Sequence, residues 1–212
     1  MSAPGRSSDR LYRLSRFLVR LWLKLYLRFE SHGSENIPAT GGCIIASNHV
    51  SYLDPPVIAC GVTHRLIHFM ARDTLLRTRI GGWFFEGVQC ISIDRNRGDV
   101  AALRKAIHVL KSGEALAVFP EGTRSLDGAL KAAKGGIGFL IAKAAVPVVP
   151  AYVDGSYDAF PKGAKWIKPG RVRVFYGPAV QPAEFAALGD DRVSYERLGA
   201  LVMSRISGLK PA

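Results

Sequence analysis

Short apolar runs that alternate with helix-like segments most restrict the fold of this 212-residue chain. Cys43–Ser47 stops at a polar Asn-His pair, and Leu116–Phe119 stops at a Pro-Glu-Gly turn. Between such runs lie segments like Ala101–Lys111, whose apolar residues recur at helical spacing. This alternation is typical of α/β proteins. We therefore predict a single α/β domain with a mixed, mostly parallel central sheet flanked by helices.

Other runs extend the same pattern. Further strands are predicted at Leu66–Met70, Cys90–Asp94, Val146–Val153 and Val172–Tyr176. Further helices are predicted to start at Asp54 and to cover Gly138–Ala144 and Ser194–Ile206. The prolines in the Val146–Val153 run predict an edge strand or a bulge. Open α/β sheets usually place their chemistry at strand ends, so those ends are the first place to look for a site.

The amino-acid composition restricts the classes of molecule that this protein can bind. Hydrophobic residues make up 48% of the chain and charged residues 22%, as in ordinary globular proteins. The net charge of +12 is unusual and favours a polyanionic partner: nucleic acid, anionic lipid or a phosphorylated substrate. Three cysteines without C-x-x-C spacing indicate neither a disulfide framework nor a zinc site, and fit a reducing, cytoplasmic setting.

The N-terminal segment Leu11–Phe29 has the pattern of a basic amphipathic helix. Its charged residues fall within an arc of roughly 120°, and the rest of the helix is mostly Leu, Val and aromatic. They are Arg13, Arg16, Arg20, Lys24 and Arg28. Each charge near a bilayer centre would cost ~2.5–3.5 kcal/mol, so a membrane-spanning helix is disfavoured. The pattern favours a helix lying in an anionic membrane interface, with packing against its own domain as the alternative.

These features predict two parts of the chain. Residues 1–30 form the membrane-interface helix and residues 31–212 form the α/β domain. Residues 1–10 are polar, and the apolar stretch after them carries a charge every turn, so no signal peptide is expected. The predicted location is the cytoplasmic face of the cell membrane, as a peripheral or monotopic protein.

His49 and Asp54 follow the strand at Cys43–Ser47. Five positions on a helix would leave the two side chains about 140° apart, so they can meet only if the chain turns between them. A carboxylate bound to one ring nitrogen would leave the other nitrogen as a proton acceptor, which a general base needs. On spacing alone, the plainer interpretation is an Asp that caps a helix before Pro55 and a satisfied loop histidine.

A second polar block follows the strand at Leu116–Phe119. Glycine in its Pro120-Glu121-Gly122 turn allows a positive φ, and successive N–H groups of such a turn can hold an anion. Arg124 adds a fixed positive charge. The alternative is an ordinary strand-to-loop turn. Arg95, after the Cys90–Asp94 run, is a further cation at a strand end.

Four blocks, in order, resemble the motifs of the glycerolipid acyltransferase family. They are Asn48-His49-x-Ser51-x-x-Asp54-Pro55, Gly87–Arg95, Phe119-Pro120-Glu121-Gly122-Thr123-Arg124-Ser125 and Val146–Pro150. The resemblance implies transfer of a fatty acyl group from acyl-CoA or acyl carrier protein to the hydroxyl of 1-acylglycerol 3-phosphate, giving phosphatidic acid. It implies His49 as general base and Asp54 as the residue that orients it. It also implies an acceptor pocket of Arg95, Glu121, Gly122 and Arg124.

The expected partners are a lysophospholipid acceptor, an acyl thioester donor and an anionic membrane surface, with acyl carrier protein as a possible partner. No metal, bound cofactor or nucleic acid is expected. One alternative is acylation of another lyso-lipid, such as a lyso-ornithine lipid. A second is a thioester or ester hydrolase, although no G-x-S-x-G motif is present. The third is a non-catalytic basic membrane-binding module.

Overall fold

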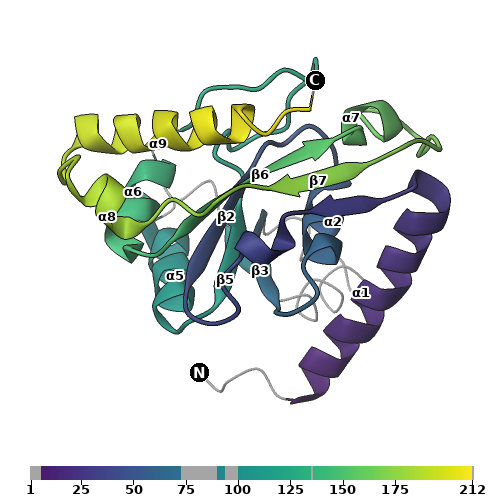
Figure 1. Ribbon diagram of the computed structural model, residues 1–212, viewed down its shortest axis with the longest axis horizontal. Coiled ribbons are helices and arrows are strands. Elements are labelled where there is room, and N and C mark those ends of the chain that lie inside the picture. Colours follow the sequence, from purple (N-terminus) through teal and green to yellow (C-terminus); the bar gives the residue numbers. More distant parts are fainter. Residues whose placement is uncertain (1–5, 73–89, 94–99, 135, 212) are drawn as a thin grey trace.

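The computed structural model describes residues 6–72, 90–93, 100–134 and 136–211 of the chain. Within these residues one twisted sheet lies between two groups of helices (Figure 1). The strands are β1 Glu30–His32, β2 Cys43–Ser47, β3 Ile67–Arg72, β4 Cys90–Ile93, β5 Ala115–Val118, β6 Val148–Asp154 and β7 Arg173–Tyr176. The α-helices are α1 Arg6–Leu27, α2 Asp54–Gly61, α5 Val100–Lys111, α6 Gly136–Ala144, α7 Ser156–Ala159, α8 Pro182–Ala186 and α9 Arg192–Ser207. A 3-10 turn, η1, covers Ser34–Asn36.

The strand order is β1-β7-β6-β2-β5-β3-β4. Every neighbouring pair is parallel except β6 and β7, which are antiparallel. The predicted α/β class with a mixed, mostly parallel sheet is therefore confirmed. Because β2 lies in the middle of this order, the residues that follow it emerge at the centre of the sheet edge.

Both faces of the sheet are buried, which explains the continuous apolar strands. Along β2, Ile45 packs with α1 and α2, whereas Ile44 packs with α5, α6 and α9 on the opposite face. Both side chains are fully buried. Parallel strands covered by helices on both faces carry apolar residues at successive positions rather than at alternate ones.

Strand β6 departs from the prediction in part. Its prolines predicted an edge or a bulge, but β6 pairs with β2 on one side and β7 on the other. Pro150 is tolerated there because its carbonyl faces the very end of β7, where it accepts from Gly177 N at 2.8 Å. Beyond Pro150 the antiparallel pairing resumes between Val148 and Val180, with one extra residue on the strand opposite β6, so the predicted edge is wrong but a bulge does lie opposite Pro150. The short strand β1 is not among the predicted strands, because three residues carry too little pattern to identify a strand.

Helix α1 is docked on α2 by two arginines of the basic face. Arg16 donates to the carbonyls of Val62, Thr63 and Arg65 at 2.8–2.9 Å, and Arg20 donates to the carbonyl of Cys60. These carbonyls lie at the C-terminal end of α2, where helix carbonyls lack partners and the helix dipole is negative. Part of the basic face thus serves packing, as the alternative interpretation of this helix proposed.

The apolar side of α1 divides in two. Leu23 and Leu27 are fully buried in the core shared with α2, so the helix packs on the domain. The division at residue 30 remains a prediction. On the outer side, large apolar side chains are exposed: Leu14, Phe17, Leu18, Leu21, Trp22, Leu25 and Tyr26. None of the helices in the described part of the chain is long and apolar enough to cross a bilayer.

Candidate active site

The site begins at the end of β2. There the backbone hydrogen bonds between β2 and β6 are followed by hydrogen bonds from the side chain of Asn48 to β6. The amide of Asn48 replaces the next ladder step: its Nδ2 donates to the Val153 carbonyl at 2.9 Å, and its Oδ1 accepts from Val153 N at 2.7 Å. Asn48 is buried, so this pair of bonds satisfies the amide and the strand together. The loop that follows leaves the sheet in a fixed direction.

His49 and Asp54 meet across this loop. His49 Nδ1 lies 2.8 Å from Asp54 Oδ2. Asp54 is fully buried, whereas the imidazole retains 17% exposure. A turn between the two residues, followed by the start of α2, brings together side chains that one helix would hold apart. The structure therefore confirms the predicted contact between the two residues; their catalytic roles are proposed below.

The Asp54 carboxylate accepts four hydrogen bonds. Oδ2 accepts from Val50 N at 2.7 Å and Ser51 N at 2.8 Å as well as from the histidine. Oδ1 accepts from Ser156 Oγ at 2.6 Å. The other three bonds come from N–H and O–H donors, so the carboxylate acts as the acceptor throughout and His49 Nδ1 is the donor of the shared bond.

Asp54 is not the helix cap that the plainer interpretation proposed. The N-cap position belongs to Leu53, and Asp54 is the first helical residue. A capping Asp54 would bond N–H groups in the first turn, but Pro55 and Pro56 have none. The next N–H, of Val57, already donates to the Leu53 carbonyl at 3.0 Å. Because the first turn of α2 offers no free N–H donor, the Asp54 carboxylate instead accepts hydrogen bonds from the preceding loop, which carries His49.

The Pro-Glu-Gly turn after β5 holds the main chain of His49. Glu121 Oε1 accepts from His49 N at 3.0 Å, and Ser125 N donates to the His49 carbonyl at 2.7 Å. Glu121 is buried, and burial raises the pKa of its carboxyl group. Its second oxygen, Oε2, has no partner among the described residues. The two separate sequence blocks therefore form one structural unit.

Gly122 has the positive φ that the sequence predicts, at 65°. Its N–H donates to the Phe119 carbonyl at 2.9 Å and closes the turn. A Cβ atom at this position would lie 2.9 Å from Lys134 Cδ, so glycine also leaves room for a lysine beside the turn. The anion-binding role of this turn stays a prediction.

Arg124 lies over the ring of Tyr52, with Cζ 3.3 Å from the ring centroid. Its Nη1 is buried and has no hydrogen-bond partner within the described ranges. Tyr52 is about half exposed, so the pair lies between the His49 loop and the surface. Arg95 lies outside the described residues, and its place in the predicted acceptor pocket remains a prediction.

The imidazole ring of His49 is held at one nitrogen and on one face. The ring of Phe119 stacks on His49, with centroids 3.9 Å apart and planes inclined by 15°. Among the residues that the structure describes, no group hydrogen bonds to Nε2. The imidazole is held by a carboxylate at Nδ1 and by an aromatic face, which leaves Nε2 as the proton acceptor. This arrangement suits a general base that acts on a hydroxyl.

Ser51, which lies in the His49 loop, is engaged, and the thiols of Cys43 and Cys60 are buried. Ser51 is fully buried, and its Oγ donates to the Phe160 carbonyl at 2.6 Å. Cys43 and Cys60 are buried free thiols, and burial raises the pKa of both, that of Cys60 to about 12. None of these groups is placed or ionised as a nucleophile requires. Over the described ranges, no group of three or more metal-ligating side chains occurs.

Three contributors to the site escaped the sequence analysis: Phe119 as a stacking partner, Tyr52 beside Arg124, and Ser156. Ser156 follows Gly155 directly after β6, so a polar residue at a strand end was its only signal. Its distance of 102 residues from Asp54 conceals the contact. Phe119 stood inside the recognised motif, but its stacking needed coordinates.

Comparisons with known proteins identify relatives of this chain. A family model described as Acyltransferase matches residues 28–154. A 1-acyl-sn-glycerol-3-phosphate acyltransferase of Bacillus subtilis (strain 168) is 27% identical over 90% of this chain and 91% of its own. A protein with the same description from Pseudomonas aeruginosa is 33% identical over 78% of this chain and 67% of its own.

A solved structure shares the fold. It is the crystal structure of the 1-acyl-sn-glycerophosphate (LPA) acyltransferase PlsC from Thermotoga maritima, 29% identical to this chain with a TM-score of 0.77. The match covers 98% of this chain and 85% of that one.

Proposed function

This chain belongs to the Acyltransferase family and is an acyltransferase, and from that premise we propose its substrates. We propose that it transfers a fatty acyl group from acyl-CoA or acyl carrier protein to the free hydroxyl of 1-acylglycerol 3-phosphate, giving phosphatidic acid. The observation that carries the proposal is the His49–Asp54 pair at 2.8 Å, in which Nδ1 is engaged and Nε2 has no hydrogen-bond partner among the described residues.

The proposed step is a direct transfer. As the acceptor hydroxyl oxygen attacks the thioester carbonyl, His49 Nε2 takes its proton. The resulting tetrahedral intermediate collapses, the C–S bond breaks, and the imidazolium returns the proton to the departing thiolate. Base catalysis of this kind contributes about 10²–10⁴-fold, and binding both substrates together supplies much of the remainder. No bound cofactor or metal takes part in the proposal.

A phosphate on the acceptor is favoured by charge. The guanidinium of Arg124 lies beside the His49 loop with one buried nitrogen unpartnered in the described structure, so a phosphate oxygen would satisfy it. Glu121 supports this site indirectly, because its contact with His49 N ties the basic turn to the catalytic loop. The proposed acceptor also agrees with the names of the relatives, 1-acyl-sn-glycerol-3-phosphate acyltransferases.

Purified enzyme should be given labelled acyl-CoA or acyl carrier protein thioester with a panel of lyso-lipids, and the products read by mass. We expect 1-acylglycerol 3-phosphate to give the highest kcat/KM. A preference for a lyso-ornithine lipid would contradict the acceptor. Release of free fatty acid without an acceptor would contradict the transferase chemistry.

The phosphate site has its own test. Arg124→Ala is expected to raise the KM for the acceptor more than the KM for the donor. Arg192→Ala is a suitable control, since Arg192 is exposed and distant in the fold, on α9. A selective rise in the donor KM would contradict the assignment.

Direct transfer predicts that both substrates bind before reaction. Kinetics should therefore be sequential, and mass spectrometry of the protein with donor alone should show no acyl adduct. A stoichiometric adduct that forms as fast as turnover would support the hydrolase-like alternative.

The proposal also places the enzyme on an anionic membrane surface, at the cytoplasmic face of the cell membrane, through the outer side of α1. Leu18 and Leu25 on that side are 56% and 77% exposed, and Arg13 and Lys24 beside them are also exposed. An apolar strip next to basic residues suits the interface of an anionic bilayer.

Leu18→Ser combined with Leu25→Ser should reduce sedimentation with anionic vesicles about tenfold or more. Val193→Ser provides a control, because Val193 is an exposed apolar residue on α9. Unchanged sedimentation of the double variant would place membrane contact elsewhere.

A further inference from the structure

The segment between α7 and β7 ends in an exposed, basic loop, residues 161–171, which we name the Trp166 loop. It contains Lys162, Lys165, Lys168 and Arg171 and no acidic residue. Arg171 pairs with Glu30 at 2.9 Å, but none of the three lysines forms an ion pair with any residue in the described ranges. Trp166 is 82% exposed, the most exposed of the large apolar side chains in the described structure.

Leaving Trp166 exposed to water has a cost in stability. A tryptophan usually buries much of its area, and exposing it forgoes that stabilisation. The loop is nevertheless well anchored: Ile167 packs against the core, and Lys168 N donates to the Ala159 carbonyl at 2.9 Å. The backbone directly after Trp166 is therefore held in place while the Trp166 side chain stays exposed. A surface that combines an exposed indole with unpaired lysines matches an anionic lipid interface.

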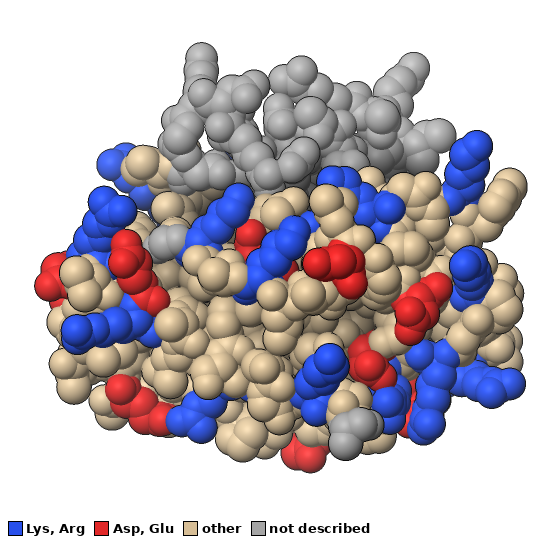
Figure 2. Space-filling model, turned by 90° about the horizontal axis from the view of Figure 1, so that it is seen from above, with Lys and Arg blue, Asp and Glu red and all other residues tan. Residues whose placement is uncertain are grey.

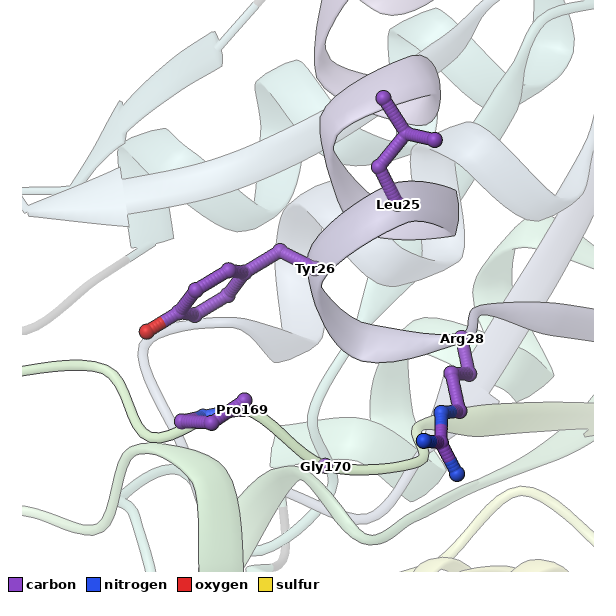
Figure 3. Close-up of a pocket in the computed structure, with 5 residues that line it drawn as sticks. All are labelled: Leu25, Tyr26, Arg28, Pro169 and Gly170. Atoms are coloured by element: carbon purple, nitrogen blue, oxygen red, sulfur yellow. The ribbon is translucent and has the colours of Figure 1, made fainter.

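The loop also touches α1. Tyr26 Oη donates to the Ile167 carbonyl at 3.0 Å, and Val172 N donates to the Leu27 carbonyl at 2.9 Å. Figure 3 shows Tyr26 reaching from the helix across Pro169, with the Arg28 side chain beside Gly170. These residues and Leu25 line an open hollow of about 490 Å³. The hollow has an apolar side and a basic side, as the boundary between acyl chain and headgroup does.

At its other end the loop reaches the catalytic site. The Phe160 carbonyl that precedes the loop accepts from Ser51 Oγ at 2.6 Å, and the rings of Phe160 and Tyr52 lie 5.9 Å apart. The loop therefore connects the end of α1 to the segment that carries His49. In Figure 1 the turn between α7 and β7 lies at the same side of the molecule as the C-terminal end of α1.

Charge elsewhere does not form one competing patch on the face seen in Figure 2. There the Lys and Arg side chains are spread over the surface and stand between Asp and Glu side chains. The basic residues of the Trp166 loop are in contrast not interrupted by any acidic residue along the chain.

We propose that the Trp166 loop is a second membrane contact, which inserts Trp166 into the interface of an anionic bilayer next to α1 and brings the His49 site to the surface where a lyso-lipid acceptor resides. The inference rests on the proposed membrane association of the enzyme. It goes beyond that association by naming a contact outside the N-terminal helix.

The position of the indole can be measured directly. The chain has three tryptophans, so Trp22→Phe with Trp83→Phe leaves Trp166 as the only one. Its emission should shift to the blue on addition of equimolar phosphatidylglycerol and phosphatidylcholine vesicles, and brominated acyl chains should quench it. Circular dichroism before and after heating verifies folding. Trp166→Phe in the otherwise native chain provides a second measurement, since the blue-shifted emission component should be lost.

The lysines have a matched control. Replacing Lys162, Lys165 and Lys168 by Gln should weaken partitioning onto these vesicles about tenfold or more. Replacing Arg104, Lys105 and Lys111 on α5 removes the same charge from a different helix and should weaken it less than about threefold. Equal losses in the two triple variants would overturn the proposal.

Other outcomes separate this inference from the proposed function. If the protein sediments with vesicles but Trp166 is neither shifted nor quenched, the loop is not a contact, while α1 still can be. If no vesicle binding occurs at all, both membrane proposals fail and only the transferase chemistry stands. If the lysine variant raises the KM for acyl carrier protein thioester with vesicle binding unchanged, the loop is a protein-docking surface and the inference is overturned.

Discussion

The two ends of α2 belong to regions of opposite character. At its N-terminal end, the Asp54 carboxylate has a donor on every side, and the loop that carries His49 is held by main-chain bonds. At its C-terminal end, the helix carbonyls hold α1, whose buried side is satisfied and whose outer side exposes Leu25 and Trp22 to water. The His49 loop thus has its hydrogen-bond partners within the protein, whereas the outer side of α1 leaves large apolar side chains exposed, as the proposed membrane contact requires.

The two ends of α2 suit different tasks, catalysis at one end and the proposed surface binding at the other. A preorganised base does not reorganise during the reaction, so it gains from bonds that are formed before substrate arrives. An interfacial helix must bind and release a surface, so it gains from groups that remain unpaired in the protein. Substitutions at the two ends should therefore affect different measurements.

The largest expected effect is at the catalytic end. His49→Ala should lower kcat/KM for transfer by about 10²-fold or more, because it removes the proton acceptor. Vesicle sedimentation and the thermal unfolding midpoint should stay close to those of the native protein. A folded variant with near-native activity would show that the His49–Asp54 pair is structural.

Ser156 tests whether the carboxylate needs its full set of donors. Ser156→Ala removes the 2.6 Å bond to Asp54 Oδ1, and kcat should fall roughly tenfold, as expected for loss of one hydrogen bond to a charged group. KM values should change little, since Ser156 acts on Asp54 and touches no substrate in this mechanism.

Ser156→Thr keeps the hydroxyl and should recover much of the activity, provided that its stability shows the extra methyl group is accommodated. If Ala and Thr lower kcat equally in equally stable proteins, the hydroxyl does not position the carboxylate.

Arg16 tests the other end. It makes three hydrogen bonds to carbonyls beyond α2, so Arg16→Ala should lower the free energy of unfolding by about 1–3 kcal/mol. Arg13→Ala removes an exposed arginine of the same helix and should change it by less than about 0.5 kcal/mol. Urea unfolding of both variants measures the difference. Equal losses would mean that Arg16 does not dock the helix.

The smallest effect concerns Cys60, which lies between the two helices with its Sγ 3.7 Å from the Arg16 carbonyl. Burial raises the pKa of its thiol from 9.0 to about 12. The folded state therefore holds a proton that the unfolded chain loses above pH 9. The resulting stabilisation is fully present below pH 9.0 and declines as the pH rises through about 12.

Native Cys60 should accordingly react slowly with a thiol reagent at pH 8, and Arg16→Ala should accelerate the reaction by loosening α1. Peptide mapping by mass spectrometry identifies the labelled cysteine. Rapid labelling of Cys60 in the native protein would show that α1 opens without any substitution.

Much of the fold was predictable because the relevant signals are local. The strand at Cys43–Ser47 agrees with β2 at both ends, and Ala101–Lys111 differs from α5 by one residue. Periodicity and turn residues suffice for such elements. The edge position predicted for β6 was wrong, whereas the predicted bulge is present opposite Pro150. The sequence shows that Pro150 lacks an N–H but not which neighbour that position faces.

The sequence alone determined the α/β class, the basic amphipathic start and the motifs that meet at the strand ends, because each depends on residues close together in the chain. Only the tertiary structure decided how those residues are used. It turned Asp54 back from a helix cap to the histidine, added Ser156 from 102 residues away, and assigned Arg16 and Arg20 to the end of α2 rather than to the surface. Hydrogen bonds depend on distance in space, and spacing along the chain cannot supply that distance once the chain has folded back on itself.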